Sequence, residues 1–370
     1  MALCCEILLV PSKMLENSLP KCKKTPWTRA RRWVCFLMLF LVMGTSALIF
    51  YNSSPQVSWP LNVWTIKLLP NQSHNNVTPS VSIISPADLS QSEYFVPYPH
   101  QYHFILDEPN RCQQESPFLV LMIPVAPHNR EARDIIRSTW GKEIRVLGQV
   151  ISHYFLLGLS KEEHEKKPLE EEILKESQRH HDILQSDFLD SYRNLTIKTM
   201  VMFEWLSSHC PNTSYAMKVD SDMFLNIHNL VNMLLKAPRH LYMTGQVLRG
   251  VYVLRDSTSK WFLPVSAFPE STYPSYALGM GYVFSLDLPK KIVEASAHVK
   301  AVYIEDVYVG LCMRHLGLSL TDPPHGLFIA TIPFFRGSCY WTSVITTLLE
   351  NSNQLANVWI TYQTQTQSGC

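Results

Sequence analysis

An alternation of apolar runs with helix-like segments constrains this chain's fold more than any other feature of its sequence. Residues 117–126 are continuously apolar, as in a buried strand, and residues 150–158 and 214–220 also have the composition of strands. Segments between them, such as residues 195–210, carry apolar side chains three and four apart, which predicts helices. Strands that alternate with helices form parallel sheets with crossover helices. In such α/β sheets, ligands bind beyond the carboxyl ends of the strands.

A second kind of apolar run lies near the N-terminus. Residues 33–51 contain no charged side chain, and a run of about 20 apolar residues crosses a hydrocarbon core of roughly 30 Å. Seven basic residues precede it and the next one is Lys67, so we expect the N-terminus in the cytosol. A cleaved signal peptide is the alternative, although the run exceeds the usual apolar core of about 7–15 residues.

These features divide the chain into four expected parts. They are a cytosolic tail at 1–32, a transmembrane signal-anchor helix at 33–51, a spacer at 52–111 without sustained periodicity, and a folded domain at 112–370. The chain is 46% hydrophobic and 17% charged with a net charge of +1, which argues against nucleic-acid binding because that function calls for a basic domain.

The cysteines and Asn-x-Ser/Thr triplets fit a luminal domain. Five cysteines follow the anchor, so at most two disulfides form within the chain and one thiol is left over, with the pairing open: Cys112, Cys210, Cys312, Cys339 and Cys370. Four triplets are candidate glycosylation sites, while Asn52 lies too close to the membrane: Asn71, Asn76, Asn194 and Asn212.

Asp220 and Asp222 follow a predicted strand, in the stretch "YAMKVDSDMFLN". In extended backbone, residues two apart point to the same side, so both carboxylates would face one ligand. Mg²⁺ or Mn²⁺ takes one or two such carboxylates while a diphosphate fills other positions. The alternative is that either aspartate caps the next helix.

Three further motifs are candidates for chemistry. Gly279 and Gly281 either let the backbone approach a ligand or only make a bend. Glu305 and Asp306 interrupt an apolar run, so one of them is either a general base or a helix cap. Arginines at helical spacing share one face, which meets phosphate or is simply solvated: Arg130, Arg133 and Arg137.

Five motifs together resemble one family. In order they are "REARDIIRSTWGKE", "ESQRHHDILQSDFLDSYRNLTIKT", "YAMKVDSDMFLN", "YPSYALGMGYVFS" and "IEDVYVGLC". This order is similar to that of the beta-1,3-galactosyltransferases, whose relatives include beta-1,3-N-acetylglucosaminyltransferases. The resemblance implies a catalytic domain of the GT-A type, a Rossmann-like sheet flanked by helices. It also implies a single-pass type II protein of the Golgi membrane, with a glycan acceptor on glycoprotein or glycolipid, and allows a homo-oligomer.

The resemblance also implies roles for single residues. Asp220 and Asp222 would hold Mn²⁺ (or Mg²⁺) against the UDP diphosphate, and Asp306 would be the base of an inverting transfer, with Glu305 as second choice. The remaining expected donor contacts are Arg133, Arg137, Lys218, Gly279 and Gly281.

Two departures bear on donor and activity. N-acetylglucosaminyl members more often carry a third acid where this chain has Ser221, so the resemblance favours UDP-galactose as donor, with UDP-N-acetylglucosamine as the alternative. Leu348 stands where galactosyl members carry a histidine that looks like a further metal ligand, and Ala277 replaces a frequent cysteine. Leucine cannot ligate a metal. Either the metal ion is bound by fewer protein ligands and more water, or a nearby residue such as His325 takes the place of the histidine. The other alternative is a weakly active or inactive member that acts as a binding or chaperone subunit.

Overall fold

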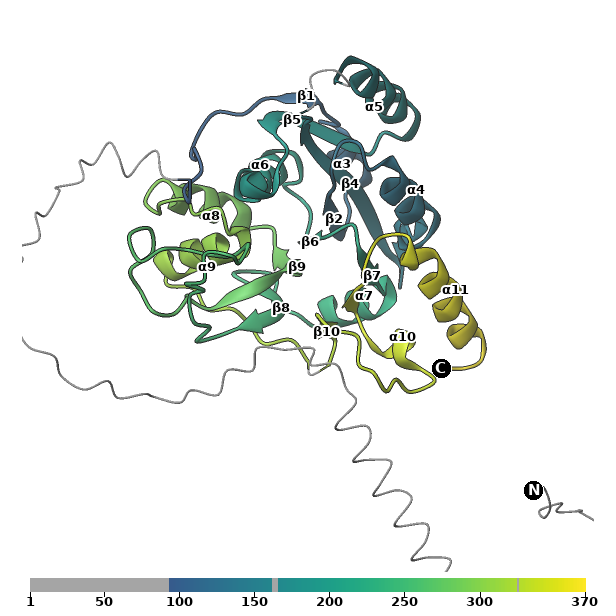
Figure 1. Cartoon of the computed structure of the whole chain (residues 1–370). Coiled ribbons are helices and arrows are strands. Elements are labelled where there is room, and N and C mark those ends of the chain that lie inside the picture. Colours follow the sequence, from purple (N-terminus) through teal and green to yellow (C-terminus); the bar gives the residue numbers. More distant parts are fainter. Residues whose placement is uncertain (1–92, 162–165, 325) are drawn as a thin grey trace, which may run out of the picture. The chain divides into compact units, whose positions relative to one another are not determined.

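A mixed sheet forms the centre of the folded part of the chain (Figure 1), in a computed structural model that describes residues 93–161, 166–324 and 326–370. The sheet's strand order is β1-β5-β4-β2-β6-β9-β8, with β3 paired to β4. The strands are β1 (Phe104–Leu106), β2 (Leu119–Pro124), β3 (Arg145–Val146), β4 (Gln149–Leu159), β5 (Ile183–Leu189), β6 (Tyr215–Val219), β8 (Met243–Leu248) and β9 (Tyr276–Ser285).

Four neighbouring strands, β5, β4, β2 and β6, are parallel, as the alternation of strands and helices predicted. The chain places β4 and then β5 on one side of β2 and β6 on the other, so the strand order reverses at β2. The second half adds β9 antiparallel to β6, and then β8 antiparallel to β9, while β1 is antiparallel to β5 at the opposite edge. A reversal of this kind opens a crevice at the carboxyl ends of the strands on either side of it.

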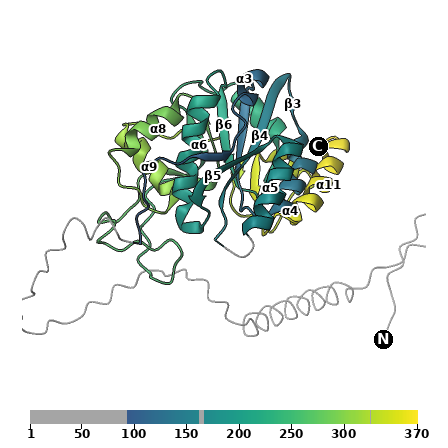
Figure 2. The ribbon, with the colours of Figure 1, turned by 90° about the horizontal axis from the view of Figure 1, so that it is seen from above.

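Helices cover both faces of the sheet (Figure 2). One face carries α4 (Arg130–Ser138), α5 (Lys166–His180), α7 (Ile227–Leu234) and α11 (Gln354–Gln367), and the other carries α6 (Leu195–His209), α8 (Leu288–Ser296) and α9 (Glu305–His315). The alternation of side chains along β2 separates the two cores, because Val120 and Met122 face one and Leu119, Leu121 and Ile123 face the other. The remaining helical turns are α3 (Arg111–Glu115), η1 (Trp140–Lys142), η2 (Tyr192–Asn194) and α10 (Tyr340–Ser343).

A smaller sheet of three strands joins the chain's C-terminal part to the segment after β6. It pairs β10 (Phe328–Ile329) with β11 (Thr346–Leu348), and β11 with β7 (Met223–Leu225). The β7–β11 pair is antiparallel, with Leu348 opposite Met223.

The folded unit begins earlier than the expected boundary at residue 112. Val96 and Tyr98 lie in the core, and the Tyr98 hydroxyl donates to Glu204 Oε1 at 2.5 Å. Strand β1 also falls within the expected spacer at 52–111. The spacer prediction was wrong for residues 94–111 because their apolar side chains are short isolated groups that contact distant segments rather than form a periodic run.

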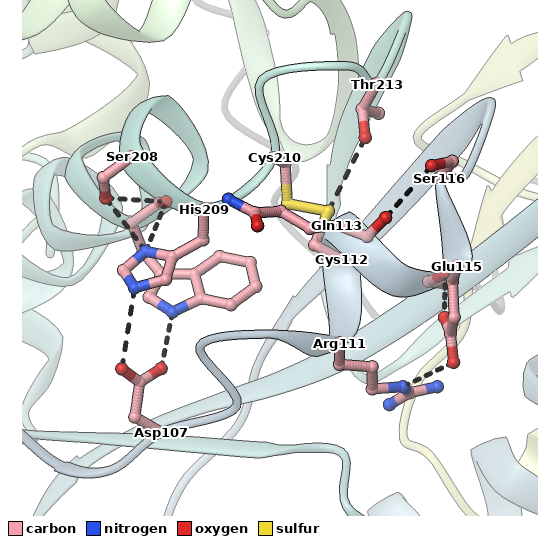
Figure 3. The surroundings of a disulfide bond; sticks show 12 residues. Asp107, Arg111, Cys112, Gln113, Glu115, Ser116, Ser208, His209, Cys210 and Thr213 are labelled. Atoms are coloured by element: carbon pink, nitrogen blue, oxygen red, sulfur yellow. Dashed lines mark hydrogen bonds and ion pairs between the residues drawn. A yellow bond between two sulfur atoms is a disulfide. The ribbon is translucent and has the colours of Figure 1, made fainter.

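Two disulfides and one free cysteine account for the cysteines of this unit. Cys112 pairs with Cys210 where α3 meets the end of α6 (Figure 3), and Cys339 pairs with Cys370. The free Cys312 is buried. The limit of two internal disulfides is confirmed, and the structure supplies the pairing that the sequence left open.

Several predictions fall outside the described residues. They concern the tail, the anchor at 33–51, most of the spacer, Asn71, Asn76 and His325. No helix within the described ranges has both the length and the apolar character that a membrane span requires.

Candidate active site

A cavity of about 700 Å³ opens at the carboxyl ends of the four parallel strands. This is the position that the parallel-sheet prediction assigned to a ligand. The segments that follow β2, β4, β5 and β6 form its wall, together with three side chains from α5 and α6: residues 124–129, Ser160 and Lys161, residues 190–192, residues 220–222, and Leu169, Leu195 and Lys198.

Asp220 and Asp222 both line this cavity. Strand β6 ends at Val219, and the chain turns there as Met223 N–H donates to the Asp220 carbonyl at 3.3 Å. Neither aspartate caps a helix, because Asn226 is the N-cap of α7 and its side chain accepts from Asn229 N–H. Burial and then the neighbouring charge of Asp220 raise the pKa of Asp222, and a cation would relieve both effects.

Lys218 connects the acid pair to the rest of the site. Its buried ammonium donates to Asp220 Oδ1 at 2.7 Å and to the Gly279 carbonyl, and lies 3.7 Å from Glu305 Oε2. Burial acts to lower the pKa of Lys218, but the charges of Asp220 and Glu305 outweigh it and hold that pKa above its ordinary value. Because Asp220 is already paired with this ammonium, Asp222 is the less neutralised carboxylate of the two.

Glu305 and Asp306 lie in the first turn of α9, close to Lys218. Gly279 N–H donates to Asp306 Oδ2 at 2.9 Å, and the Tyr282 hydroxyl donates to Glu305 Oε1 at 2.6 Å. Burial raises the pKa of Glu305 to about 7, with the Lys218 charge opposing, and burial also raises the pKa of Asp306. The N-cap of α9 is Ile304, so neither acid is the cap that the alternative reading required.

Gly279 is required by close approach rather than by a bend. A Cβ at this position would meet Glu305 Oε2 at 3.0 Å and Asp306 Oδ2 at 3.3 Å. At Gly281 the nearest atom to a Cβ would be the flexible end of Met217, at 3.2 Å, and the Lys218 carbonyl oxygen follows at 3.7 Å. The structure therefore brings Lys218, Asp220, Gly279, Glu305 and Asp306 into one connected network, from three separate stretches of sequence.

The arginines lie behind the cavity wall instead of in it. Arg133, 1% exposed, donates from Nε and Nη2 to the Glu176 carboxylate at 2.8 and 2.7 Å. Its Nη1 donates to the carbonyls of Ala126 and Pro127, which belong to the cavity wall. Burial acts to raise the pKa values of Glu176 and Asp182, but pairing with arginine outweighs it and lowers both.

Arg137 is engaged in the same cluster. Its guanidinium donates to Glu176 Oε1 and to both oxygens of Asp182, at 2.7–2.8 Å. We expected Arg133 and Arg137 to contact the donor, but the structure directs their charges at Glu176 and Asp182 instead. Of the two side chains, Arg133 also supports the cavity wall, through its hydrogen bonds to backbone carbonyls there.

A buried lysine in the cavity wall was missed from the sequence. Lys198 Nζ donates to the Val125 carbonyl at 2.9 Å and to Asp190 Oδ2 at 2.7 Å, and Asp190 also accepts from Gly158 N–H at 3.0 Å. Burial lowers the pKa of Lys198, against the charge of Asp190. The signal was present, because a lysine within the apolar helical stretch "LTIKTMVMF" is rarely buried without a partner.

Leu348 lies on the strand that pairs with the segment after the acid pair, and its replacement of a metal ligand stays a prediction. It is opposite Met223, the residue after Asp222, and Leu349 N–H donates to the Asp222 carbonyl at 3.0 Å. In the described part of the chain, no three His, Cys, Asp or Glu side chains lie close enough together to hold a metal ion. The residues present fit a hard cation bound through Asp222, with Asp220 shared with Lys218, and with the other positions filled by oxygens from outside the protein.

The two described glycosylation candidates differ in exposure. Asn212 is exposed, whereas Asn194 is partly buried and its Nδ2 donates to the Leu189 carbonyl at 2.8 Å. Glycan attachment at either site stays a prediction.

The galactosyltransferase family model matches residues 131–324, more than half of the chain. Beta-1,3-galactosyltransferase 2 of Homo sapiens is 41% identical over 278 residues, which make up 74% of this chain and 65% of that protein. Beta-1,3-galactosyltransferase 1 of Mus musculus is 43% identical over 223 residues, 60% of this chain and 67% of that protein. The chain spans just under two thirds of the length of the first relative.

One solved structure shows a loose likeness. It is the crystal structure of a glycosyltransferase involved in the glycosylation of the major capsid of PBCV-1, with a TM-score of 0.36 and 10% sequence identity over 65% of this chain and 98% of that chain. A likeness of this size does not define the fold. The family model and the two close relatives do agree, and the matched stretch carries Asp220, Gly279 and Asp306, so this chain belongs to the beta-1,3-galactosyltransferase family.

Proposed function

We propose that this chain is an inverting glycosyltransferase of the GT-A type that moves galactose from UDP-galactose, in β-1,3 linkage, to a glycan acceptor. The observation that carries the proposal is the placement of Asp220 and Asp222 in a cavity at the carboxyl ends of the parallel strands, joined through Lys218 and Gly279 to Asp306. Names of the relatives support the sugar and the linkage.

The proposed roles follow from chemistry. A divalent cation, Mn²⁺ or Mg²⁺, would neutralise the diphosphate and stabilise it as a leaving group. Asp222 would hold this cation together with Asp220, and Lys218 keeps Asp220 in place. Asp306 accepts the proton of the acceptor hydroxyl, and burial, which raises its pKa, makes it a stronger base than an exposed carboxylate. Direct displacement with one base inverts the configuration of the donor sugar.

Glu305 is a weaker candidate for the base. Its Oε1 accepts from the Tyr282 hydroxyl, its Oε2 faces Lys218, and it is 7% exposed, so no acceptor hydroxyl reaches it without displacing this packing. We assign it to the support of Lys218. For location, we propose the Golgi membrane with a luminal catalytic domain, on the charge pattern around residues 33–51.

A donor screen tests the proposal. The purified full chain is given Mn²⁺, a panel of glycan acceptors and either UDP-galactose or UDP-N-acetylglucosamine, and the linkage of any product is determined. We expect galactose transfer in β-1,3 linkage, and Asp306→Asn should lower kcat by a factor of about 100 to 10,000 while UDP binding persists. The matched control is Asp322→Asn, an exposed aspartate whose partner is Arg249 at the surface.

The screen separates the two alternatives as well. Transfer of N-acetylglucosamine alone would replace the donor in the proposal. A chain that turns over neither donor, while a relative does so under the same conditions, would be a binding or chaperone subunit, which Leu348 favours because it removes one possible metal ligand. Calorimetry then shows whether Mn²⁺-dependent UDP binding persists and is lost in Asp222→Ala.

A further inference from the structure

Two half-exposed aromatic rings stand together at the rim of the cavity. Tyr192 belongs to the cavity wall and is 44% exposed, and Trp261, in the long connection from β8 to β9, is 46% exposed. The Lys260 ammonium lies 4.5 Å from the Trp261 ring centroid and 5.4 Å from that of Tyr192. One cation therefore joins two rings that come from distant parts of the sequence.

The connection that presents Trp261 is tied down on the protein side. The Tyr303 hydroxyl lies 2.9 Å from the carbonyl oxygens of both Lys260 and Phe262 and shares its single hydrogen between them. Leu263 is completely buried, and the Arg255 guanidinium donates to the carbonyls of three residues of this connection, Leu263, Phe268 and Glu270. An exposed aromatic ring on so well anchored a segment is pre-organised for a ligand, since little ordering remains to be done on binding.

Tyr192 lines the same cavity as Asp220 and Asp222. Burial, and then the charge of Asp306, raise the pKa of the Tyr192 hydroxyl to about 12; Asp220 adds a smaller effect and a hydrogen bond from Trp261 opposes. Tyr192 is thus within electrostatic range of both the proposed base and the acid pair.

The chemistry of the rim matches a sugar ring. A pyranose has polar edges and faces that carry C–H groups, and such a face packs well on an aromatic ring. Among the described residues Lys260 forms no ion pair with a carboxylate, although its charge acts to lower the pKa of Asp222. Its ammonium can therefore donate to hydroxyl groups. We propose that Tyr192, Lys260 and Trp261 form a saccharide-binding shelf that holds a pyranose ring of the acceptor; this inference rests on the proposed function.

Steady-state kinetics on the full chain test the shelf. The probes are the methyl β-glycosides of galactose, N-acetylglucosamine and N-acetylgalactosamine, with UDP-galactose and Mn²⁺ saturating. Trp261→Ala should raise the KM of the acceptor about tenfold, while the KM of UDP-galactose and the thermal unfolding midpoint stay unchanged. Trp261→Phe keeps an aromatic face and should raise the acceptor KM by less.

Val265→Ala is the matched control, since Val265 is in the same connection and 62% exposed. It should leave both KM values unchanged. An unchanged acceptor KM in Trp261→Ala overturns the shelf. A rise in the KM of UDP-galactose instead of the acceptor KM also overturns it, because the rim would then serve the donor.

A binding measurement keeps the shelf distinct from the proposed function. If the wild-type chain turns over no UDP-sugar, the proposed function fails, and saturation-transfer NMR with UDP, Mn²⁺ and the same three glycosides decides the shelf. Signal transfer to a glycoside that is lost in Trp261→Ala and kept in Val265→Ala supports it. No signal transfer from the wild-type chain overturns it.

Discussion

Lys218 is the residue on which the arrangement of charges in this site depends. Asp220, Asp222, Glu305 and Asp306 were all identifiable from the sequence as acids in unusual places. The separate roles of these acids could not be predicted, because they depend on which carboxylates the Lys218 ammonium reaches. It lies 2.7 Å from Asp220 and 3.7 Å from Glu305. Asp222 and Asp306 are left to act on ligands, and the two partners of Lys218 support them.

Glu305 makes stability depend on pH in a direction that can be measured. Its folded pKa of about 7 lies above the unfolded value, so between about pH 4.5 and 7 the folded chain binds more protons, and its free energy of unfolding falls as the pH rises. Glu305→Gln removes this titration and still accepts from the Tyr282 hydroxyl. The difference in the free energy of unfolding between variant and wild type should therefore shift in favour of the variant by up to about 3 kcal/mol when the pH rises from about 5 to about 8.

Denaturant unfolding of the full chain at the two pH values measures this effect. Glu294→Gln, at an exposed position of α8, is the matched control and should follow the wild type at both. Parallel pH dependences for wild type and Glu305→Gln would mean that Glu305 is already ionised in the folded chain well below pH 7.

Leu348 gives a second prediction at the scale of one residue. It lies opposite Met223 and next to the segment that contacts Asp222. Leu348→His places an imidazole, a common metal ligand, beside the acid pair, and should tighten Mn²⁺ binding on the order of tenfold. Calorimetry of Mn²⁺ in the presence of UDP measures this, and Leu348→Gln, polar but a poor ligand, is the control. Equal affinity in all three chains would place the cation away from residue 348.

At the scale of elements, α9 carries the proposed base to the sheet. Its helical character was expected from the sequence, but the depth at which it packs was not. A Cβ at Gly310 would lie 2.7 Å from the Ser275 carbonyl oxygen and 2.8 Å from Tyr276 Cβ, so the missing side chain lets α9 rest directly on β9. This contact is one turn from Asp306, whose carboxylate accepts from Gly279 N–H of the same strand.

Gly310→Ala tests this contact. Alanine favours helix more than glycine does, but the added methyl pushes α9 away from β9, as overpacking does elsewhere. We expect a loss of about 1–3 kcal/mol in the free energy of unfolding, together with a lower kcat. Gly337→Ala, where a Cβ meets nothing within 4 Å, is the control and should change neither. A Gly310→Ala chain as stable and active as wild type would show that α9 shifts without cost.

At the scale of the whole molecule, long-range links hold the site's parts together. The β7–β11 pair brings residues 346–348 beside the segment after β6, and the Cys112–Cys210 disulfide closes a loop of 98 residues that includes β2, β4 and β5. Sequence patterns found the strands β2, β4 and β6. They did not find β1 or β11, which are three residues long and owe their form to their neighbours.

The disulfide that closes this long loop should contribute much of the stability. Replacing Cys112 and Cys210 by alanine frees the unfolded chain, and we expect the free energy of unfolding to fall by about 4 kcal/mol. Replacing Cys339 and Cys370, which are 31 residues apart, should cost less. Chemical denaturation of both double variants decides this. Equal losses, or a larger loss for the shorter loop, would assign the stabilisation to local contacts instead of loop closure.

The sequence by itself determined the α/β class, the strand end that carries Asp220 and Asp222, and the family, because periodicity and short motifs are local properties of a chain. Only the tertiary structure decided that Lys218 neutralises Asp220, that Arg133 and Arg137 face acids behind the cavity, and that Trp261 stands beside Tyr192. Each of these depends on distances between residues far apart in sequence. Such distances are set by how the helices and connections pack on the sheet, which no local pattern encodes.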